Sequence, residues 1–370
     1  MSDFQIQSKS ITLVLTHQCN LRCGYCYEKH KDNETMSLEM AKSILDYELT
    51  LDDGINDAEI DLFGGEPLLE FETIKALVEY AKQRTYPKGY IFFITTNGVL
   101  LDDERKAWFK ENARYLQMGL SLDGTKEMHD RNRCNSFDSI DLDFFQTVYP
   151  AQSVKMTISN ATLQNLAEGV IFCHETGFNV SCNLAYGIDW SSSENAALLE
   201  YQLMMLIEYY KEHPEITPCA MLDVNRLKYL SYSMNEFSRY CGAGYAMKAY
   251  DYDGQAYPCQ HFLPISIGKE KALASLDIDF SEYVLDEAEL TKECRDCVIR
   301  NLCPSCYGEN FSATGNIHRR DKNMCHLFKI QFKALAYFIS ELFRLDRLQS
   351  YSNAEKAALL KSALLINQAL

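Results

Sequence analysis

Three cysteines, Cys19, Cys23 and Cys26, lie within eight residues and have the spacing C-x3-C-x2-C. They follow an apolar run, residues 11–15, that is typical of a buried strand. Three thiolates on one loop can ligate three irons of a cubane 4Fe–4S cluster, which leaves the fourth iron open to a substrate or cofactor. The alternative is a zinc ion, which needs a fourth ligand nearby, and His17 and His30 are candidates for that ligand.

A glycine pair and a carboxylate follow the second apolar run, residues 58–63. In Gly64-Gly65-Glu66-Pro67 the two glycines let the backbone approach a ligand closely, because no Cβ intervenes. The carboxylate beside them can accept a hydrogen bond from an ammonium group. The alternative is an ordinary turn.

Hydrogen-bonding side chains also end the third and fourth apolar runs. Thr96 and Asn97 end the third, although Asn97-Gly98 is equally typical of a turn. Ser121 ends the fourth, and Arg133 follows it. A hydroxyl group and a guanidinium supply hydrogen-bond donors for a polar ligand.

The second half of the chain carries seven more regularly spaced cysteines. Two C-x2-C pairs are separated by five residues, and single cysteines flank them. A zinc ribbon separates its pairs by roughly 15–20 residues, and seven thiols exceed one zinc site. Two further iron–sulfur clusters therefore fit the number better. The seven residues are Cys241, Cys259, Cys294, Cys297, Cys303, Cys306 and Cys325.

The elements that must position these motifs alternate between strand and helix patterns. This alternation predicts a parallel sheet covered by helices, an α/β fold. In folds with parallel strands and outer helices, binding and catalytic sites lie at the C-terminal ends of the strands. Each of the motifs in the first half of the chain lies at such an end. We expect strands over residues 11–16, 58–63, 90–95, 116–122, 153–159 and 178–185, and helices over 37–51, 71–84, 102–112, 160–176 and 193–213.

Beyond these elements, Asp253-Gly254 predicts a tight turn, so Cys241 and Cys259 should flank or lie on a small β-hairpin. Apolar residues recur at helical spacing over 324–348 and 353–370. This spacing predicts amphipathic helices packed on the barrel, with a partner-binding helix as the alternative.

Composition narrows the class of protein. The chain has 370 residues and 14 cysteines, with a formal charge of −16. The acidic charge disfavours a general grip on nucleic acid. No apolar run reaches the roughly 18 residues that cross a bilayer, and the N-terminus lacks the pattern of a signal peptide, so we expect a cytoplasmic protein. Many cysteines without a secretion signal indicate metal binding rather than disulfides.

The three-cysteine loop, with an aromatic residue before its last cysteine, resembles the signature of the radical S-adenosylmethionine (radical SAM) enzymes. In that family the open iron binds S-adenosylmethionine, and the reduced cluster cleaves it to a 5′-deoxyadenosyl radical. The resemblance implies a partial (β/α)6 TIM-like barrel. It also implies cofactor contacts from Tyr25, Gly64, Gly65, Glu66, Pro67, Thr96, Asn97, Ser121 and Arg133.

The later cysteines resemble the SPASM extension of a subset of radical SAM enzymes, a small cysteine-rich region that binds two auxiliary 4Fe–4S clusters. The resemblance assigns Cys294, Cys297, Cys303 and Cys325 to an outer cluster and Cys241, Cys259 and Cys306 to an inner one. The fourth inner ligand stays open, with His261 or the substrate as candidates. Three clusters are implied in all. The expected domains are a barrel over residues 1–225, the SPASM region over 226–330 and C-terminal helices over 331–370.

Relatives with this extension mostly modify peptides or proteins. We therefore expect a maturase of a ribosomally made peptide that forms a thioether or carbon–carbon crosslink. A second interpretation is an anaerobic sulfatase-maturating enzyme, which generates formylglycine. Such relatives carry an aspartate directly after the cysteine that matches Cys259, where this chain has Gln260. A radical SAM enzyme that acts on a small molecule, an RNA-modifying enzyme and a non-catalytic metal scaffold are three further classes that these motifs allow.

The residue that acts after hydrogen abstraction is not identified by the resemblance, and the candidates are Tyr25, Tyr27, Gln260, His261 and Glu309. Only ten residues precede the first expected strand, so we expect either a separate leader-binding protein or a direct hold on the substrate. An electron donor such as ferredoxin or flavodoxin completes the expected partners, which include neither nucleic acid nor a membrane.

Overall fold

The computed structural model describes residues 8–230, 241–280 and 290–370. Contacts between residues divide the described chain into two compact units. The first unit comprises residues 8–122, 133–155 and 242–280, and the second comprises residues 123–132, 156–230, 241 and 290–370. The expected functional boundaries near residues 225 and 330 stay a prediction.

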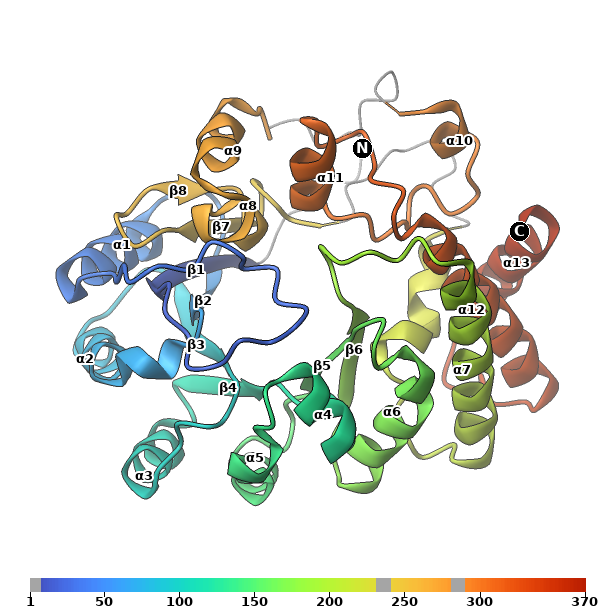
Figure 1. Cartoon of the computed structure of the whole chain (residues 1–370), viewed down its shortest axis with the longest axis horizontal. Helices are drawn as coiled ribbons and strands as arrows, with labels where there is room; N and C mark the ends of the chain where they lie inside the picture. Colours follow the sequence, from blue (N-terminus) through green and yellow to red (C-terminus); the bar gives the residue numbers. More distant parts are fainter. Residues whose placement is uncertain (1–7, 231–240, 281–289) are drawn as a thin grey trace. The chain divides into compact units, whose positions relative to one another are not determined.

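A six-stranded sheet with the strand order β4-β3-β2-β1-β7-β8 forms the core of the first unit (Figure 1). Neighbours from β4 to β7 pair in parallel, and β8 pairs antiparallel with β7. The strands are β1 Ser8–Thr16, β2 Asp57–Gly64, β3 Gly89–Thr96, β4 Leu116–Leu120, β7 Met247–Tyr250 and β8 Ala256–Tyr257.

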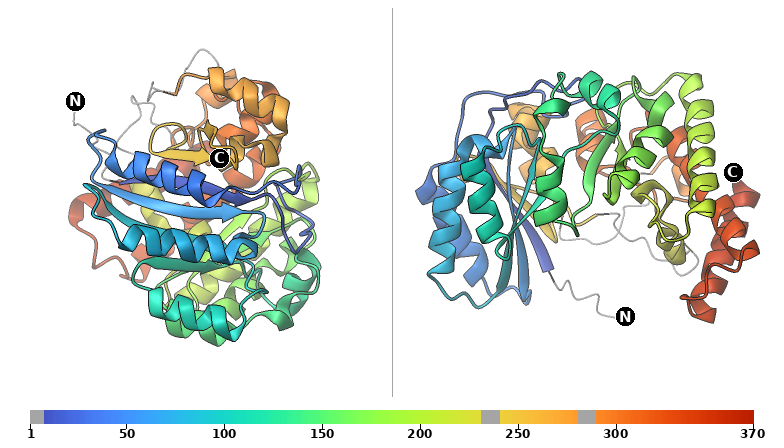
Figure 2. Two further views of the ribbon diagram at one scale, coloured as in Figure 1. Left: turned by 90° about the vertical axis from the view of Figure 1, so that its left-hand side faces the viewer. Right: turned by 90° about the horizontal axis from the view of Figure 1, so that it is seen from below.

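Helices α1, α2 and α3 cover one face of this sheet (Figures 1 and 2). Helix α2 buries Ile74, Leu77, Val78 and Ala81, the spacing of a single helix face. Side-chain caps start its neighbours, because the Ser37 hydroxyl and the Asp102 carboxylate each accept a backbone N–H of the first turn. The helices of this unit are α1 Leu38–Thr50, α2 Phe71–Lys82, α3 Asp103–Asn112, α5 Leu142–Val148, α8 Pro264–Ile267 and α9 Lys269–Ala274.

A buried ion cluster ties the hairpin β7-β8 to the rest of the first unit. The Glu48 carboxylate on α1 is fully buried and binds the ammonium groups of Lys9 on β1 and Lys248 on β7. It also accepts the Tyr250 hydroxyl. Burial alone would raise the pKa of Glu48, but the hydrogen bonds from Lys248, Lys9 and Tyr250 outweigh it and lower that pKa. The cluster therefore fixes the edge of β1 on which β7 pairs.

The second unit is mostly helical. Strands β5 Val154–Ile158 and β6 Val180–Leu184 form a separate two-stranded sheet. Helix α12 packs against α7 and α13, and it buries Leu327, Phe332 and Leu335 among other residues. The helices are α4 Lys126–Asn132, α6 Leu166–Glu175, α7 Ser193–Glu212, α10 Lys292–Arg295, α11 Tyr307–Thr314, α12 Cys325–Arg344 and α13 Asn353–Ala369.

The α/β class, the parallel sheet and all six expected strands are confirmed, as are the hairpin and the two C-terminal helices. Two details differ from expectation. The helix expected over 160–176 begins only at Leu166, because the Thr162 hydroxyl accepts the Ser159 backbone N–H and holds a turn there. Helices α4 and α5 were not expected. None of the helices in the described part of the chain combines the length and the apolar character that a bilayer crossing requires.

Candidate functional site

The three-cysteine loop leaves the C-terminal end of β1 and returns to it. The backbone N–H of His17 donates to the Glu34 carbonyl at 3.0 Å, and that of Met36 donates to the Leu15 carbonyl at 2.8 Å. Cys19, Cys23 and Cys26 are free thiols, each partly exposed. The loop is therefore closed at its base while its sulfur atoms remain accessible.

His17 anchors the loop rather than offering a metal ligand. Its Nδ1 lies 2.8 Å from the Asp32 carboxylate and its Nε2 lies 2.7 Å from the Asp251 carboxylate, so both ring nitrogens are engaged. Burial would lower the pKa of His17, but the two carboxylates outweigh it and raise that pKa. The zinc alternative thus loses one of its two candidate histidines, while His30 is exposed.

A cation lies against one of the three sulfurs. The Lys31 ammonium is 3.0 Å from Cys26 Sγ and 2.8 Å from the Glu28 backbone carbonyl. Burial would lower the pKa of Lys31, but the Glu28 carboxylate and the Cys26 thiol outweigh it and raise that pKa. Burial raises the pKa of Glu28, and Lys31 opposes that rise. Nothing in the spacing of these residues indicated the contact.

The glycine pair is required by the loop itself. A Cβ on Gly64 would lie 2.3 Å from the Thr16 carbonyl oxygen, and one on Gly65 would lie 2.4 Å from that of Gln18. The backbone N–H groups of Gly65 and Glu66 donate to the same two carbonyls at 3.0 and 2.9 Å. The end of β2 thus packs directly on the start of the cysteine loop, and only glycine allows this approach.

Glu66 is buried and held by residues that end β3. Its carboxylate accepts the Thr96 hydroxyl at 2.7 Å and the Asn97 backbone N–H at 2.9 Å. It also accepts the backbone N–H of Leu68, in the short 3₁₀ helix that starts at Pro67. Burial raises the pKa of Glu66, although these hydrogen bonds oppose the rise. The Asn97 amide also donates to Asn20 of the cysteine loop at 2.8 Å, so the predicted residues of β2, β3 and the loop are brought together.

Arg133, Tyr25 and Ser121 lie in the same unit. The Arg133 guanidinium is 5.4 Å from the centre of the Tyr25 ring, and its positive charge acts on Glu66. Ser121 follows β4, and its backbone N–H donates to the Thr96 carbonyl at 2.9 Å. Cys134 and Asn135, directly after Arg133, both have positive φ angles near 60°. Such strained residues concentrate at functional sites.

The candidate catalytic residues separate into two groups. Tyr27 stacks on His261 with ring centres 4.5 Å apart, and burial raises the pKa of Tyr27. Gln260 is adjacent to His261, and its Oε1 atom is buried without a hydrogen-bond partner. Glu309 lies on α11 in the second unit, and Tyr25, the fifth candidate, lies beside Arg133 in the first.

Asp61 on β2 is a residue that sequence reasoning missed. It alternates with Ile60 and Leu62, which are fully buried, and so points to the opposite face of the sheet. Its Oδ1 atom is buried without a hydrogen-bond partner. Burial, helped by Glu59 and opposed by Lys155, raises the pKa of Asp61 to about 7. In the sequence Asp61 is the last of three alternating acidic residues of β2, after Asp57 and Glu59, and nothing in the sequence distinguishes it from them.

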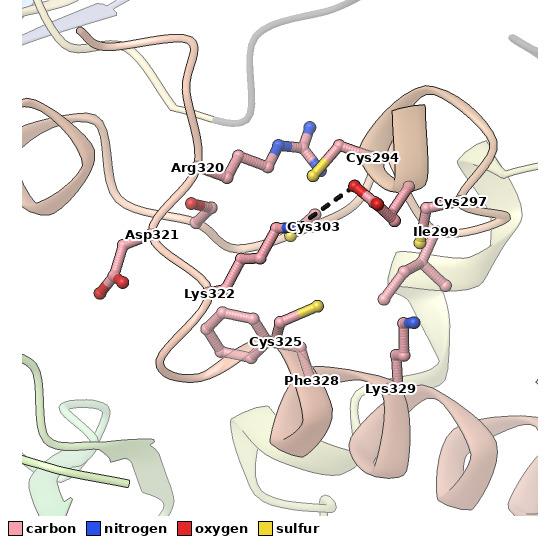
Figure 3. Close-up of a pocket in the computed structure, with 12 residues that line it drawn as sticks. Cys294, Cys297, Ile299, Cys303, Arg320, Asp321, Lys322, Cys325, Phe328 and Lys329 are labelled. Carbon is pink, nitrogen blue, oxygen red and sulfur yellow. Dashed lines mark hydrogen bonds and ion pairs between the residues drawn. The ribbon is translucent and has the colours of Figure 1, made fainter. Parts of the chain in front are cut away.

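In the second unit, Cys294, Cys297, Cys303 and Cys325 line a single cavity of about 230 Å³ (Figure 3). Arg320, Lys322 and Lys329 line the same cavity. Burial raises the pKa of Cys303 and of Cys325, and the positive charges of Arg320 and Lys329 oppose the rise. The cations therefore favour the thiolate form that binds metal.

Arginine side chains hold the loops around this cavity. Arg320 donates to the Arg300 carbonyl at 2.6 Å, and Arg300 donates to the Arg295 carbonyl at 2.7 Å. Across the described residues, no three His, Cys, Asp or Glu side chains are arranged to hold a single metal ion. A cubane is wider than one ion, so four thiols around a cavity of this size, lined by cations, fit an anionic 4Fe–4S cluster.

The three predicted inner ligands lie in different units. Cys259 follows β8 in the first unit, whereas Cys241 and Cys306 belong to the second. Their assignment to one cluster stays a prediction.

Comparison with known families decides the class. Residues 13–196 match the model of the radical SAM superfamily. This range includes the cysteine loop, the Gly64–Pro67 motif and all strands from β2 to β6. The chain carries a radical SAM domain. The cysteine-rich second half fits a SPASM-type extension.

The relatives of higher identity match about a third of the chain. A segment of 116 residues is 36% identical to an uncharacterized protein of Methanocaldococcus jannaschii, covering 31% of this chain and 39% of that protein. A segment of 139 residues is 33% identical to a cysteine-type anaerobic sulfatase-maturating enzyme of Clostridium novyi, covering 35% of this chain and 36% of that one. The chain thus matches well under half the length of these two relatives. The radical SAM cyclopropyl synthase TigE of Paramaledivibacter caminithermalis is 21% identical over 92% of this chain and 76% of its own.

Solved structures resemble the enzyme over most of its length. The sulfatase-maturating enzyme anSMEcpe with bound AdoMet has a TM-score of 0.71 at 19% identity, covering 95% of this chain and 97% of that one. SuiB of Streptococcus suis, solved with its precursor peptide SuiA, has a TM-score of 0.56 at 18% identity, covering 85% and 75%. At these identities the likeness establishes the fold.

Proposed function

We propose that this radical SAM enzyme modifies a peptide or protein, as a maturase of a ribosomally made peptide that forms a thioether or carbon–carbon crosslink. The observation that carries the proposal is the four-cysteine cavity in the second unit, a site for an auxiliary cluster in addition to the three-cysteine loop. The similarity to TigE and the likeness to structures solved with bound peptides, anSMEcpe with Cp18Cys and SuiB with SuiA, support a peptide substrate.

In this proposal the first unit holds the cofactor. Cys19, Cys23 and Cys26 bind three irons of a 4Fe–4S cluster, and S-adenosylmethionine bound there supplies the hydrogen-abstracting radical. The hydrogen bonds from Thr96 and Asn97 hold the Glu66 carboxylate in place. This carboxylate would accept a hydrogen bond from the amino group of S-adenosylmethionine. The remaining predicted contacts bind other parts of the same molecule, including its ribose and its carboxylate group. They include Gly64, Gly65, Tyr25, Ser121 and Arg133.

In the same proposal the cysteines of the second half bind the auxiliary clusters. Cys294, Cys297, Cys303 and Cys325 supply four thiolates to the outer cluster, and their cationic lining offsets its negative charge. Cys241, Cys259 and Cys306 supply three to the inner cluster. An electron donor such as ferredoxin or flavodoxin is the partner that this scheme needs.

On the substrate side, Asp61 is our candidate proton acceptor. Its pKa of about 7 suits a general base at neutral pH, and its buried Oδ1 atom is unengaged. Gln260 cannot accept a proton at neutral pH, but its unengaged buried Oε1 can accept a peptide N–H.

The sulfatase-maturating reaction is the second candidate, because a relative of that name is similar to 35% of the chain. Gln260 in place of the aspartate of those relatives disfavours it. The two reactions leave different products, since a crosslink removes two hydrogens from the peptide whereas formylglycine formation removes the cysteine thiol.

The experiment that tests the proposal is anaerobic reconstitution followed by iron and sulfide analysis and a 5′-deoxyadenosine assay with a reductant. Three cubanes correspond to about twelve irons per chain. Mass spectrometry of a sulfatase-type cysteine peptide and of a precursor peptide encoded beside the enzyme then separates the two products. Zinc without iron, or iron without deoxyadenosine, would contradict the proposal.

A further inference from the structure

The Lys31 side chain places a positive charge directly on a predicted ligand of the radical SAM cluster. Its Nζ lies 3.0 Å from Cys26 Sγ, and the Glu28 carbonyl at 2.8 Å and carboxylate at 3.3 Å hold it in place. The Glu28 side chain is 6% exposed and that of Lys31 is 26% exposed, so water screens this charge only partly.

A neutral donor contacts another sulfur of the loop. The sulfur of Cys19 accepts a hydrogen bond from the neutral backbone N–H of Leu21 at 3.4 Å, which is longer and weaker than the ammonium contact. Charge-assisted bonds to sulfur are among the features of a protein that set the potential of an iron–sulfur cluster. The ammonium group of Lys31 is therefore the stronger of these two donors to a sulfur of the loop.

We propose that Lys31 sets the reduction potential of the cluster on the three-cysteine loop. The proposal rests on the proposed function, which places an iron–sulfur cluster there. One-electron reduction adds a negative charge to the cluster and its thiolates. An ammonium group 3.0 Å from one of those sulfurs stabilises the reduced form more than the oxidised form, so Lys31 makes the cluster easier to reduce.

The direction of the effect is therefore defined. Lys31→Met keeps most of the side-chain volume and removes the charge, so the cluster should become harder to reduce. At a fixed applied potential we expect the ratio of reduced to oxidised cluster to fall about tenfold, which for one electron corresponds to a midpoint about 59 mV lower. Lys31→Arg keeps a cation in place and should stay close to the wild type.

The test is an anaerobic redox titration of the full chain, followed by electron paramagnetic resonance. The signal of the three-cysteine cluster is the one that changes when S-adenosylmethionine is added and that is lost in a Cys19→Ala variant, since the inner cluster also has only three assigned thiolates. Lys75→Met is the matched control, since Lys75 pairs with Glu72 on α2 and the same charge is removed away from the loop. The signals that S-adenosylmethionine leaves unchanged give an internal reference in every sample.

A lowered midpoint in Lys31→Met alone, with Lys31→Arg and Lys75→Met unchanged, supports the proposal. An unshifted Lys31→Met with full iron content overturns it, as does a Lys31→Arg shift as large as that of Lys31→Met, which would indicate packing rather than charge. If Lys31→Met loses iron, Lys31→Gln is judged by the same criterion. A wild type without any signal that responds to S-adenosylmethionine would refute both this proposal and the proposed function, whereas a responsive wild type with an unshifted variant refutes Lys31 alone.

Discussion

Replacing Asp61 with asparagine should make the stability of this protein less sensitive to pH. Burial raises the pKa of Asp61 from an ordinary 3.8 to about 7, so the folded state binds this proton more tightly than the unfolded state does. The contribution of the protonated group to stability is complete below pH 4 and is lost as the pH rises to 7. Asparagine does not titrate, so the variant should not show this loss.

The magnitude follows from the width of that window. Between pH 5 and pH 7 each pH unit costs the folded state about 1.4 kcal/mol through this one group, or about 3 kcal/mol in total. Above pH 7 the loss levels off, because Asp61 is then ionised in both states. The free energy of unfolding of Asp61→Asn minus that of the wild type should therefore rise by about 3 kcal/mol from pH 5 to pH 8.

Anaerobic urea unfolding at pH 5, 6, 7 and 8, followed by far-ultraviolet circular dichroism, measures this difference. The asparagine amide also loses hydrogen bonds to water when buried, which shifts the difference equally at every pH, so only the slope is diagnostic. Asp52→Asn is the control, because Asp52 is exposed after α1. A difference that stays constant from pH 5 to pH 8 would refute the assignment of a buried, proton-binding Asp61.

Two further predictions concern residues with defined partners. Glu66→Gln should weaken S-adenosylmethionine binding at least tenfold, because it removes the negative charge that Thr96 and Asn97 hold in place. Equilibrium dialysis measures this affinity. An unchanged affinity would show that Glu66 does not bind the cofactor. Glu48→Ala should lower the free energy of unfolding by about 1.5–3 kcal/mol, because it removes the buried partner of Lys9 while Lys9 keeps its ion pair with Asp53. The pKa of Glu48 is lowered in the folded state, so the ionised Glu48 stabilises the fold above its ordinary pKa, and this stabilisation is lost as the pH falls below that value. The loss of unfolding free energy in Glu48→Ala should therefore be smaller in acid than at pH 7. A loss that does not depend on pH would contradict this.

Local patterns predicted the elements well, and long-range pairings poorly. The six strands and the main helices follow from apolar periodicity, which each segment carries in its own residues. The parallel pairing of β7 with β1 joins residues more than 200 positions apart and is specified by Glu48, Lys9 and Lys248 from three elements. Helices α4 and α5 have only seven residues each, too few for a periodic signal.

The candidate site shows the same division. The resemblance to the SPASM extension assigned Cys294, Cys297, Cys303 and Cys325 to one cluster, and these four residues line one cavity. Spacing could not predict the contact of Lys31 with Cys26, because it depends on the path of the loop. Asp61 alternates in the sequence with two other acidic residues of β2, Asp57 and Glu59, so only the structure shows that its Oδ1 atom is buried and unengaged.

The charges around the cysteines differ in sign from the net charge of the chain. The chain carries a formal charge of −16, which argues for partners other than nucleic acid but says nothing about its metal sites. At both described cysteine sites the sulfur atoms lie beside cations, Lys31 at the loop and Arg320 with Lys329 at the cavity. An iron–sulfur cluster bound by thiolates is anionic, and reduction makes it more so, hence local cations in an acidic protein are what such clusters require. The two sites differ in their number of thiols, three at the loop and four at the cavity, so in the proposed function the loop leaves an iron open for the cofactor and the cavity does not.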